Sequence, residues 1–132
     1  MTNPTSTTDN SFELAQLAAT IADSKKATDV TVLQTGPVSF MAEYFVICSG
    51  ESSTQIKTIA TEIEKQFKDK SLLPIGKEKD GSNRWILMDF GDVIVHVMGS
   101  EEREFYQLEK FWSHATPVAK EKWLQKAELL AS

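Results

Sequence analysis

The chain has 132 residues, of which 41% are hydrophobic and 25% are charged. These proportions are typical of a single globular domain and exclude a collagen-like, coiled-coil or globally disordered chain. With 14 basic and 19 acidic residues the formal net charge is −5, so the chain lacks the basic stripe with which nucleic-acid-binding domains neutralise phosphates.

The N-terminal segment, residues 1–10, is rich in Thr, Ser and Asn and is expected to be disordered. It lacks a secretory signal core and an arginine-rich import pattern, and no apolar run in the chain could span a membrane. The cytosol is therefore the expected compartment. Ser11 is expected to cap a helix whose apolar residues recur at helical spacing and which ends near Lys25 and Lys26.

Two strands and a helix are predicted next. Residues 30–33 form a short strand that stops at a Gly-Pro turn, and residues 44–48 are apolar without alternation, as expected for a central strand covered on both faces. Ser52 and Gln55 fit a capping box. The helix that follows, residues 52–68, has one apolar face formed by Ile56, Ile59, Ala60, Ile63 and Phe67.

A β-hairpin is the most informative pattern in the second half. Residues 73–76 predict a short edge strand and residues 77–83 a loop, after which residues 85–89 and 93–98 form a hairpin around Phe90-Gly91. A two-residue turn would place Met88 opposite Val93. One face of the hairpin is then aliphatic core, and the other consists of Trp85, Leu87, Ile94, His96 and Met98.

The C-terminal part predicts two helices. Ser100 is expected to cap the first, which carries Phe105, Leu108 and Trp112 on one face, and Pro117 ends it. Val118 to Leu130 predict a charged terminal helix. The element order predicts one α/β domain over residues 11–115, with a mixed sheet of about five strands packed with helices, followed by a helical tail, residues 116–132.

Candidates for catalysis are few. Cys48 lies in the apolar strand without the base and electropositive setting that a thiolate needs, so a buried structural cysteine is the favoured interpretation. His96 is alone in its strand and cannot form a metal site by itself. Residues 49–53 resemble an anion-binding turn, but the capping role of Ser52 explains them. Asp89 and Asp92 flank the hairpin turn and are interpreted as turn formers. We predict no catalytic residue, no metal and no cofactor.

Three segments resemble the ribosomal silencing factor (Iojap-like) family. Residues 43–50, Glu-Tyr-Phe-Val-Ile-Cys-Ser-Gly, resemble its DYFVI-SG-SS signature. Residues 85–97 resemble its W-L-D-GDV-VHV block, and residues 103–112 its REFY-LE-LW block. The blocks occur in family order. Glu43 stands where Asp is usual, Phe90 where Tyr or Leu is common, and the tail from Thr116 runs past the usual end of the family.

The resemblance implies a mixed-sheet domain of nucleotidyltransferase-like topology that is not an enzyme. It also implies a translational repressor in the cytoplasm that binds ribosomal protein fourteen of the large subunit and blocks joining of the small subunit. Direct nucleic-acid specificity and membrane contact are not expected. Homodimers are seen in the family, so a second copy of the chain is a further partner that the resemblance implies.

The partner-binding surface is placed on the hairpin and its flank. Phe90 is the strongest candidate, because a hairpin tip offers an aromatic side chain little cover. Trp85 and Asp89 lie beside it. Met88 is included on the family block alone, and Tyr44 and Lys57 are weaker candidates.

Two alternatives stay open from the sequence. One is a nucleotidyltransferase-like enzyme that uses Asp89 and Asp92, although a third convergent carboxylate is missing. The other is an adaptor or dimerisation module whose partner is not the ribosome.

Overall fold

The computed structural model describes residues 6–36, 42–79, 81–111 and 113–124, and the side chains of all of these except 6–9 and 111. Within them lie helices α1 (Ser6–Ser24), α2 (Ser53–Asp69), α3 (Ser100–Tyr106), α4 (Leu108–Phe111) and α5 (Lys120–Trp123). The strands are β1 (Thr28–Gln34), β2 (Tyr44–Gly50), β3 (Gly76–Lys79), β4 (Trp85–Asp89), β5 (Val93–Gly99) and β6 (Thr116–Val118).

The strands form one mixed sheet in the order β3-β4-β5-β2-β1-β6. Only the central pair β2 and β5 is parallel; the other neighbours are antiparallel. Every residue of β2 and β5 is buried, which confirms the central position predicted for the apolar run at 44–48. A mixed α/β sheet packed with helices is therefore the architecture, with one strand more than the five predicted.

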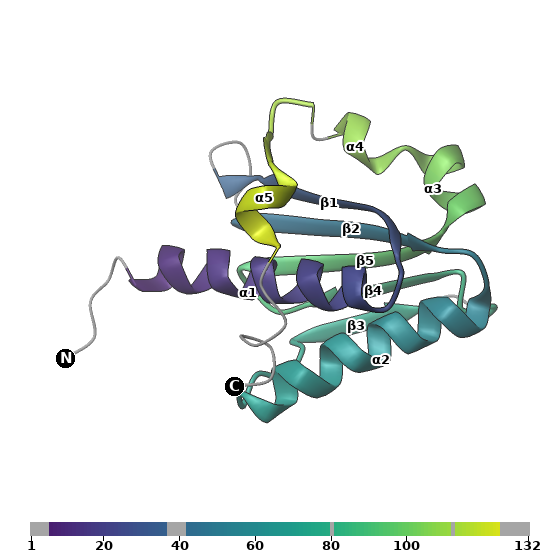
Figure 1. Cartoon of the computed structure of the whole chain (residues 1–132), viewed down its shortest axis with the longest axis horizontal. Coiled ribbons are helices and arrows are strands. Elements are labelled where there is room, and N and C mark those ends of the chain that lie inside the picture. Colours follow the sequence, from purple (N-terminus) through teal and green to yellow (C-terminus); the bar gives the residue numbers. More distant parts are fainter. Residues whose placement is uncertain (1–5, 37–41, 80, 112, 125–132) are drawn as a thin grey trace.

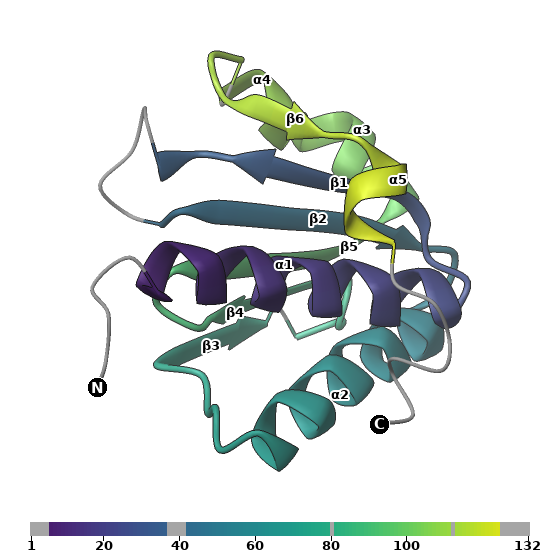
Figure 2. The ribbon, with the colours of Figure 1, turned by 60° about the vertical axis from the view of Figure 1, so that its left-hand side comes forward.

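Helices α1 and α2 cover one face of this sheet, as Figures 1 and 2 show. The apolar face of α2 is fully buried, as its spacing predicted. Its start is also confirmed: Ser52 accepts a hydrogen bond from the backbone N–H of Gln55 at 3.1 Å, and the Gln55 side chain accepts one from the N–H of Glu51 at 2.7 Å. The layer beneath these helices is apolar and contains the inward residues of β4 and β5, Ile86, Met88, Val93, Val95 and Val97.

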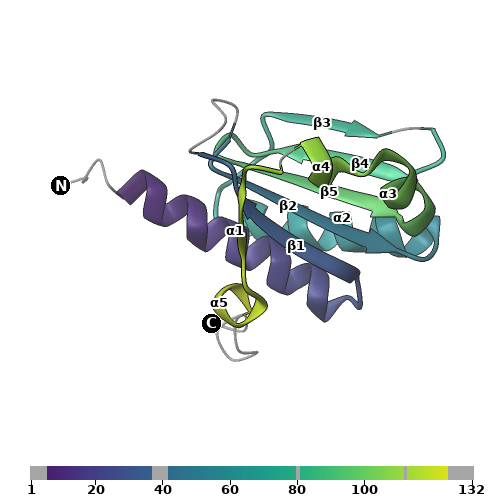
Figure 3. The same ribbon diagram turned by 90° about the horizontal axis from the view of Figure 1, so that it is seen from above.

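The opposite face is covered less completely, by the short helices α3 and α4 (Figure 3). Its buried residues include Phe45, Ile47, Ile94 and Met98, with Trp85, Leu87 and Leu108 packed partly against them. Leu87 pairs with His96, and Met88 with Val95. The predicted register was wrong by two residues, because the turn spans Phe90 to Val93 and is closed by the N–H of Phe90 donating to the carbonyl of Val93 at 2.9 Å. A shift of two keeps each side chain on its predicted face.

Several element ends differ from the predictions. Residues 6–10, expected to be disordered, extend α1, so Ser11 is buried inside the helix and is not its cap. The edge strand lies at Gly76–Lys79 within the expected loop. Gly99, and not Ser100, is the N-cap of α3, and a left-handed Gln107 ends that helix before α4 begins.

The tail from Thr116 is partly a strand. β6 pairs with the outer edge of β1, and α5 then crosses to α1 (Figure 2). The Trp123 side chain is buried in the layer between the sheet and the two long helices. The hydroxyl of Thr20 donates to the carbonyl of Trp123 at 3.0 Å, and the Gln16 amide donates to that of Lys122 at 2.8 Å. The prediction of a continuous helix from Val118 was wrong for the residues up to Leu124, because Val118 ends β6 and only Lys120–Trp123 are helical. Residues 125–130 lie outside the described part. No helix among the described residues has the length and hydropathy of a membrane span.

Candidate functional site

Trp85 is held from two sides at the start of β4. Its indole Nε1–H donates a hydrogen bond to Nδ1 of His96 at 3.1 Å, and its ring lies 4.9 Å from that of Tyr106 on α3. His96 is 5% exposed, and burial lowers its pKa to about 4. The imidazole is therefore neutral at pH 7 and its Nδ1 can accept the indole proton. Trp85 is thus a positioned side chain rather than a mobile one.

An exposed aromatic surface continues from Trp85 onto α3. Tyr106 is 47% exposed and Phe105 is 79% exposed, and their rings meet edge to face at 5.0 Å. Beside Trp85 and Leu87 lies an open hollow of about 350 Å³, lined also by Glu78 and Lys79 of β3. We call Trp85, Leu87, Phe105 and Tyr106 the β4–α3 ledge. Aromatic groups that remain accessible while their neighbours fix them are typical anchors of protein interfaces.

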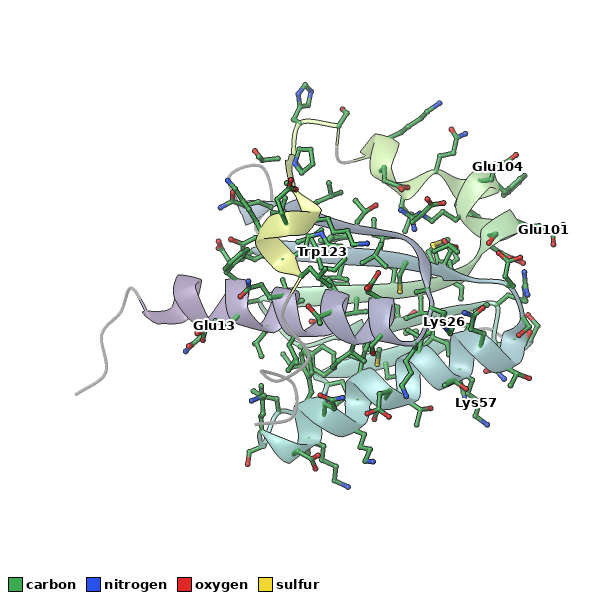
Figure 4. All side chains as sticks on the ribbon, viewed as in Figure 1. Glu13, Lys26, Lys57, Glu101, Glu104 and Trp123 are labelled. Atoms are coloured by element: carbon green, nitrogen blue, oxygen red, sulfur yellow. The ribbon has the colours of Figure 1, made fainter. Side chains whose placement is uncertain are left out.

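Acidic residues of α3 and β3 lie near the ledge. Figure 4 shows Glu101 and Glu104 extending from α3, and Glu78 lines the hollow beside Trp85. Glu102 pairs with Arg84, the residue before Trp85, through guanidinium-to-carboxylate distances of 3.1–3.3 Å. This ion pair passes directly over Gly99, where an added Cβ would lie 2.3 Å from Arg84 and 2.2 Å from Glu102. The surface around the ledge is suited to a basic partner.

The structure does not bring the six predicted partner-binding residues together. Trp85, Leu87 and Asp89 are every second residue of β4 and lie on its α3 side. Asp89 also stabilises the turn, because its Oδ1 accepts the N–H of Gly91 at 2.8 Å. Met88 is completely buried on the other face. Tyr44 is buried too, with its ring 5.8 Å from that of Phe12. Neither side chain offers a partner a surface in this conformation, and the alternation of the strands is the reason.

Phe90 and Lys57 lie with the long helices. The Phe90 ring packs on Phe67 of α2 at 4.5 Å and is half-buried, so the expectation that the hairpin tip lacks cover was wrong. Phe90 follows Asp89 at the end of β4, so alternation places its side chain on the Met88 side, facing α2. Lys57 is exposed on α2, on the far side of the molecule from α3 (Figure 4).

Sequence reasoning missed Phe105 and Tyr106 as surface residues. Their helix was expected to continue to Pro117, with Phe105, Leu108 and Trp112 on one face; Trp112 itself lies outside the described residues. Arg103 is the buried residue of α3, so Phe105, two residues later, lies on the opposite side of the helix. Because α3 ends at Tyr106 and Gln107 adopts φ 48°, Leu108 does not continue the face of Phe105. Gln is not among the residues enriched in left-handed geometry, so no local signal marked the end of the helix.

The residues considered for catalysis have structural partners. Cys48 is fully buried, and burial raises the pKa of its thiol to about 12, so it carries no thiolate at neutral pH. Ser52 caps α2, and Ser49 is buried and accepts a hydrogen bond from Arg103 at 3.1 Å. Among the described residues no group of three or more His, Cys, Asp or Glu side chains is arranged to hold a metal ion.

These features define a small mixed-sheet α/β domain whose distinctive feature is an aromatic, acid-flanked surface. The model of the family described as "Ribosomal silencing factor during starvation" matches residues 8–130. The chain belongs to that family, and the name of the family indicates a regulatory factor associated with the ribosome.

Relatives and solved structures agree with this assignment. The ribosomal silencing factor of Bacillus subtilis is 39% identical over 110 residues, which cover 83% of this chain and 92% of the relative. A crystal structure from Bacillus halodurans superposes with a TM-score of 0.71 at 38% identity, covering 81% of this chain and 97% of that one. A second, from Chromobacterium violaceum, has a TM-score of 0.73 at 30% identity, covering 76% and 84%.

Proposed function

We propose that the protein represses translation in the cytoplasm by binding ribosomal protein fourteen of the large subunit and so preventing the small subunit from joining. Family membership carries the ribosomal part of this proposal. The β4–α3 ledge is the observation that supports the location of the binding surface, because it is an apolar, preformed anchor with acidic residues nearby. No chemical step is needed, because a protein bound at the junction between subunits blocks their association by occupying space.

The electrostatics favour a basic protein partner over bare RNA. The formal net charge is −5, Glu101 and Glu104 extend from α3, and Glu78 lines the hollow beside Trp85 together with Lys79. Phosphates would be repelled by such a surface, whereas a basic ribosomal protein would be attracted and oriented by it. The apolar contacts of Trp85 and Phe105 would then supply most of the affinity, since buried aromatic anchors dominate interfaces.

The test is sedimentation of the protein with separated ribosomal subunits, followed by an assay of subunit joining. We expect comigration with the large subunit alone and fewer joined ribosomes as the protein is added. Trp85→Ala should weaken large-subunit binding by about thirtyfold, which corresponds to ~2 kcal/mol for an aromatic anchor. Lys57→Ala is the matched control from the far side and should bind within about twofold of the unchanged protein.

Other outcomes would contradict the proposal or move the interface. Comigration with neither subunit would contradict the proposal and favour an adaptor with a non-ribosomal partner. Loss of binding in Lys57→Ala alone would move the interface to α2. Thermal melting of both variants has to accompany the assay, because unfolding of Trp85→Ala would assign Trp85 to the core instead.

A further inference from the structure

The polar contacts of Arg103 are unusually complete for a side chain that is 10% exposed. Nε and Nη2 donate to Glu109 Oε2 at 3.0 and 2.6 Å, and Nη2 also donates to the hydroxyl of Thr31 at 2.8 Å. Nη1 donates to Ser49 Oγ at 3.1 Å and to the backbone carbonyl of Asp29. All five guanidinium N–H groups therefore have acceptors.

These acceptors come from three different elements. Asp29 and Thr31 belong to β1, Ser49 to β2 and Glu109 to α4, whereas Arg103 itself lies on α3. Asp29 adopts φ 50° within an irregularity of β1, a conformation that Asp tolerates, and its carbonyl accepts from the guanidinium. A lysine ammonium donates from a single point and could not reach all of these acceptors together. The site is built for an arginine.

Arg103 is also the main anchor of α3. The helix has seven residues, and Arg103 is its one buried side chain. Isolated helices shorter than ~12–15 residues are marginal in water, and Phe105 and Tyr106 are too exposed to supply an apolar anchor. The second contact is the Arg84–Glu102 ion pair. The position of Tyr106, one turn after Arg103, therefore depends on these polar contacts.

We propose that Arg103 is a positioning residue for partner binding, which holds α3 so that Tyr106 packs on Trp85 and the β4–α3 ledge is formed before the partner arrives. The proposal rests on the proposed function for its binding readout. The Arg103 guanidinium contacts β1, β2 and α4, not the ledge itself, so it contributes by preorganisation. A ledge that had to be ordered on binding would lose affinity, because the ordering would cost free energy at that step.

The experiment compares Arg103→Lys with Ile63→Val in the full chain. Ile63 is a fully buried residue of α2, on the opposite face of the sheet, so its truncation lowers stability modestly without touching α3. Two properties are measured below the melting transition of both variants: binding to the large subunit, and the NMR resonance of the Trp85 indole Nε1–H, identified by its loss in Trp85→Phe.

We expect Arg103→Lys to weaken binding by about tenfold and to shift or broaden the Trp85 indole resonance, because α3 would no longer hold Tyr106 in place. Ile63→Val should leave the resonance in place and binding within about twofold. If Arg103→Lys does not fold, Glu109→Gln takes its place; it removes one acceptor and should produce the same resonance change with a smaller loss of binding, roughly threefold.

Two results would overturn the proposal. One is an unshifted Trp85 resonance in a folded Arg103 or Glu109 variant. The other is a loss of binding in these variants no larger than in Ile63→Val. If the unchanged protein fails to bind the large subunit, the proposed function is wrong, but the indole resonance still decides whether Arg103 positions Trp85.

Discussion

The two faces of the sheet are held by different forces. Under α1 and α2 the contacts are almost entirely apolar, and α1 contributes the small buried residues Ala15, Ala18, Ala19 and Ala22, which let it pack close to the strands. Over the opposite face, α3 and α4 are held by the polar contacts of Arg84 and Arg103, and aromatic side chains remain accessible. Both faces belong to one sheet and share its strands.

The α1 and α2 face mainly stabilises the fold, whereas the α3 face leaves a surface that a partner can recognise. Apolar burial is non-directional and roughly proportional to area, so a well-covered face stabilises the fold but leaves no surface to a partner. Guanidinium–carboxylate pairs are directional, and they can fix a short helix without covering the residues around it. The α3 face can therefore be rigid and accessible at once.

The largest effect is expected at Trp123, which fastens the tail to the α1 face and is 2% exposed. Trp123→Ala should lower the free energy of unfolding by about 3–5 kcal/mol, the usual range for a buried tryptophan, as measured by chemical denaturation. The neighbouring Leu124 is 43% exposed, and Leu124→Ala should cost no more than about 0.5 kcal/mol. A loss below 1 kcal/mol in Trp123→Ala would show that the tail adds nothing to that layer.

Acid should destabilise the fold through His96, on the α3 face. Its pKa is lowered from 6.5 to about 4 by burial, so between these values the unfolded chain binds a proton that the folded protein does not. Stability is therefore complete above pH 6.5 and falls as the pH is lowered toward 4, by on the order of 3 kcal/mol. His96→Gln keeps an acceptor for Trp85 and does not titrate, so its stability should depend less on pH in this window. Equal slopes in the two proteins would contradict the assignment.

Strand faces were predictable from the sequence because the side-chain period of two survives errors in register. The hairpin turn was misjudged, yet Ile86 and Val95 still lie in the apolar layer and Leu87 and His96 on the other side. The capping box at Ser52 was predictable for a similar reason, because the signal is local and the structure realises it within one helical turn.

The candidate surface was less predictable because it depends on where α3 stops. Nothing local to Phe105 shows that Arg103 is the buried residue of α3, or that a left-handed Gln107 separates Phe105 from Leu108. Phe90 illustrates the opposite error: the tip was expected to be bare, but contact with Phe67 joins positions that are distant in sequence. β6 was missed because three residues around a proline carry little strand pattern, and pairing with β1 overrides that.

A smaller effect is expected at Phe90. Its ring is half-buried against Phe67 at 4.5 Å, so Phe90→Ala should cost about 1–3 kcal/mol of stability, less than a fully buried aromatic residue. Binding to the large subunit, measured below the melting transition, should change by no more than about twofold. A loss of binding without a loss of stability would place the hairpin tip in the interface, as the sequence first suggested. The face covered by α1 and α2 would then also contribute to partner binding.

The smallest effect on stability, and the sharpest test of the comparison, is expected at Phe105. The chain offers a control matched in exposure: Phe105 is 79% exposed on the ledge, and Ile75 is 77% exposed at the start of the edge strand, beside Gly91. Phe105→Ser and Ile75→Ser should each change the free energy of unfolding by no more than about 0.5 kcal/mol, because neither side chain is buried. Only Phe105→Ser should weaken large-subunit binding, by about tenfold, since an anchor contributes only when a partner covers it. If Ile75→Ser weakens binding and Phe105→Ser does not, the partner covers the hairpin end of the sheet, and the accessible aromatic residues of α3 need another explanation.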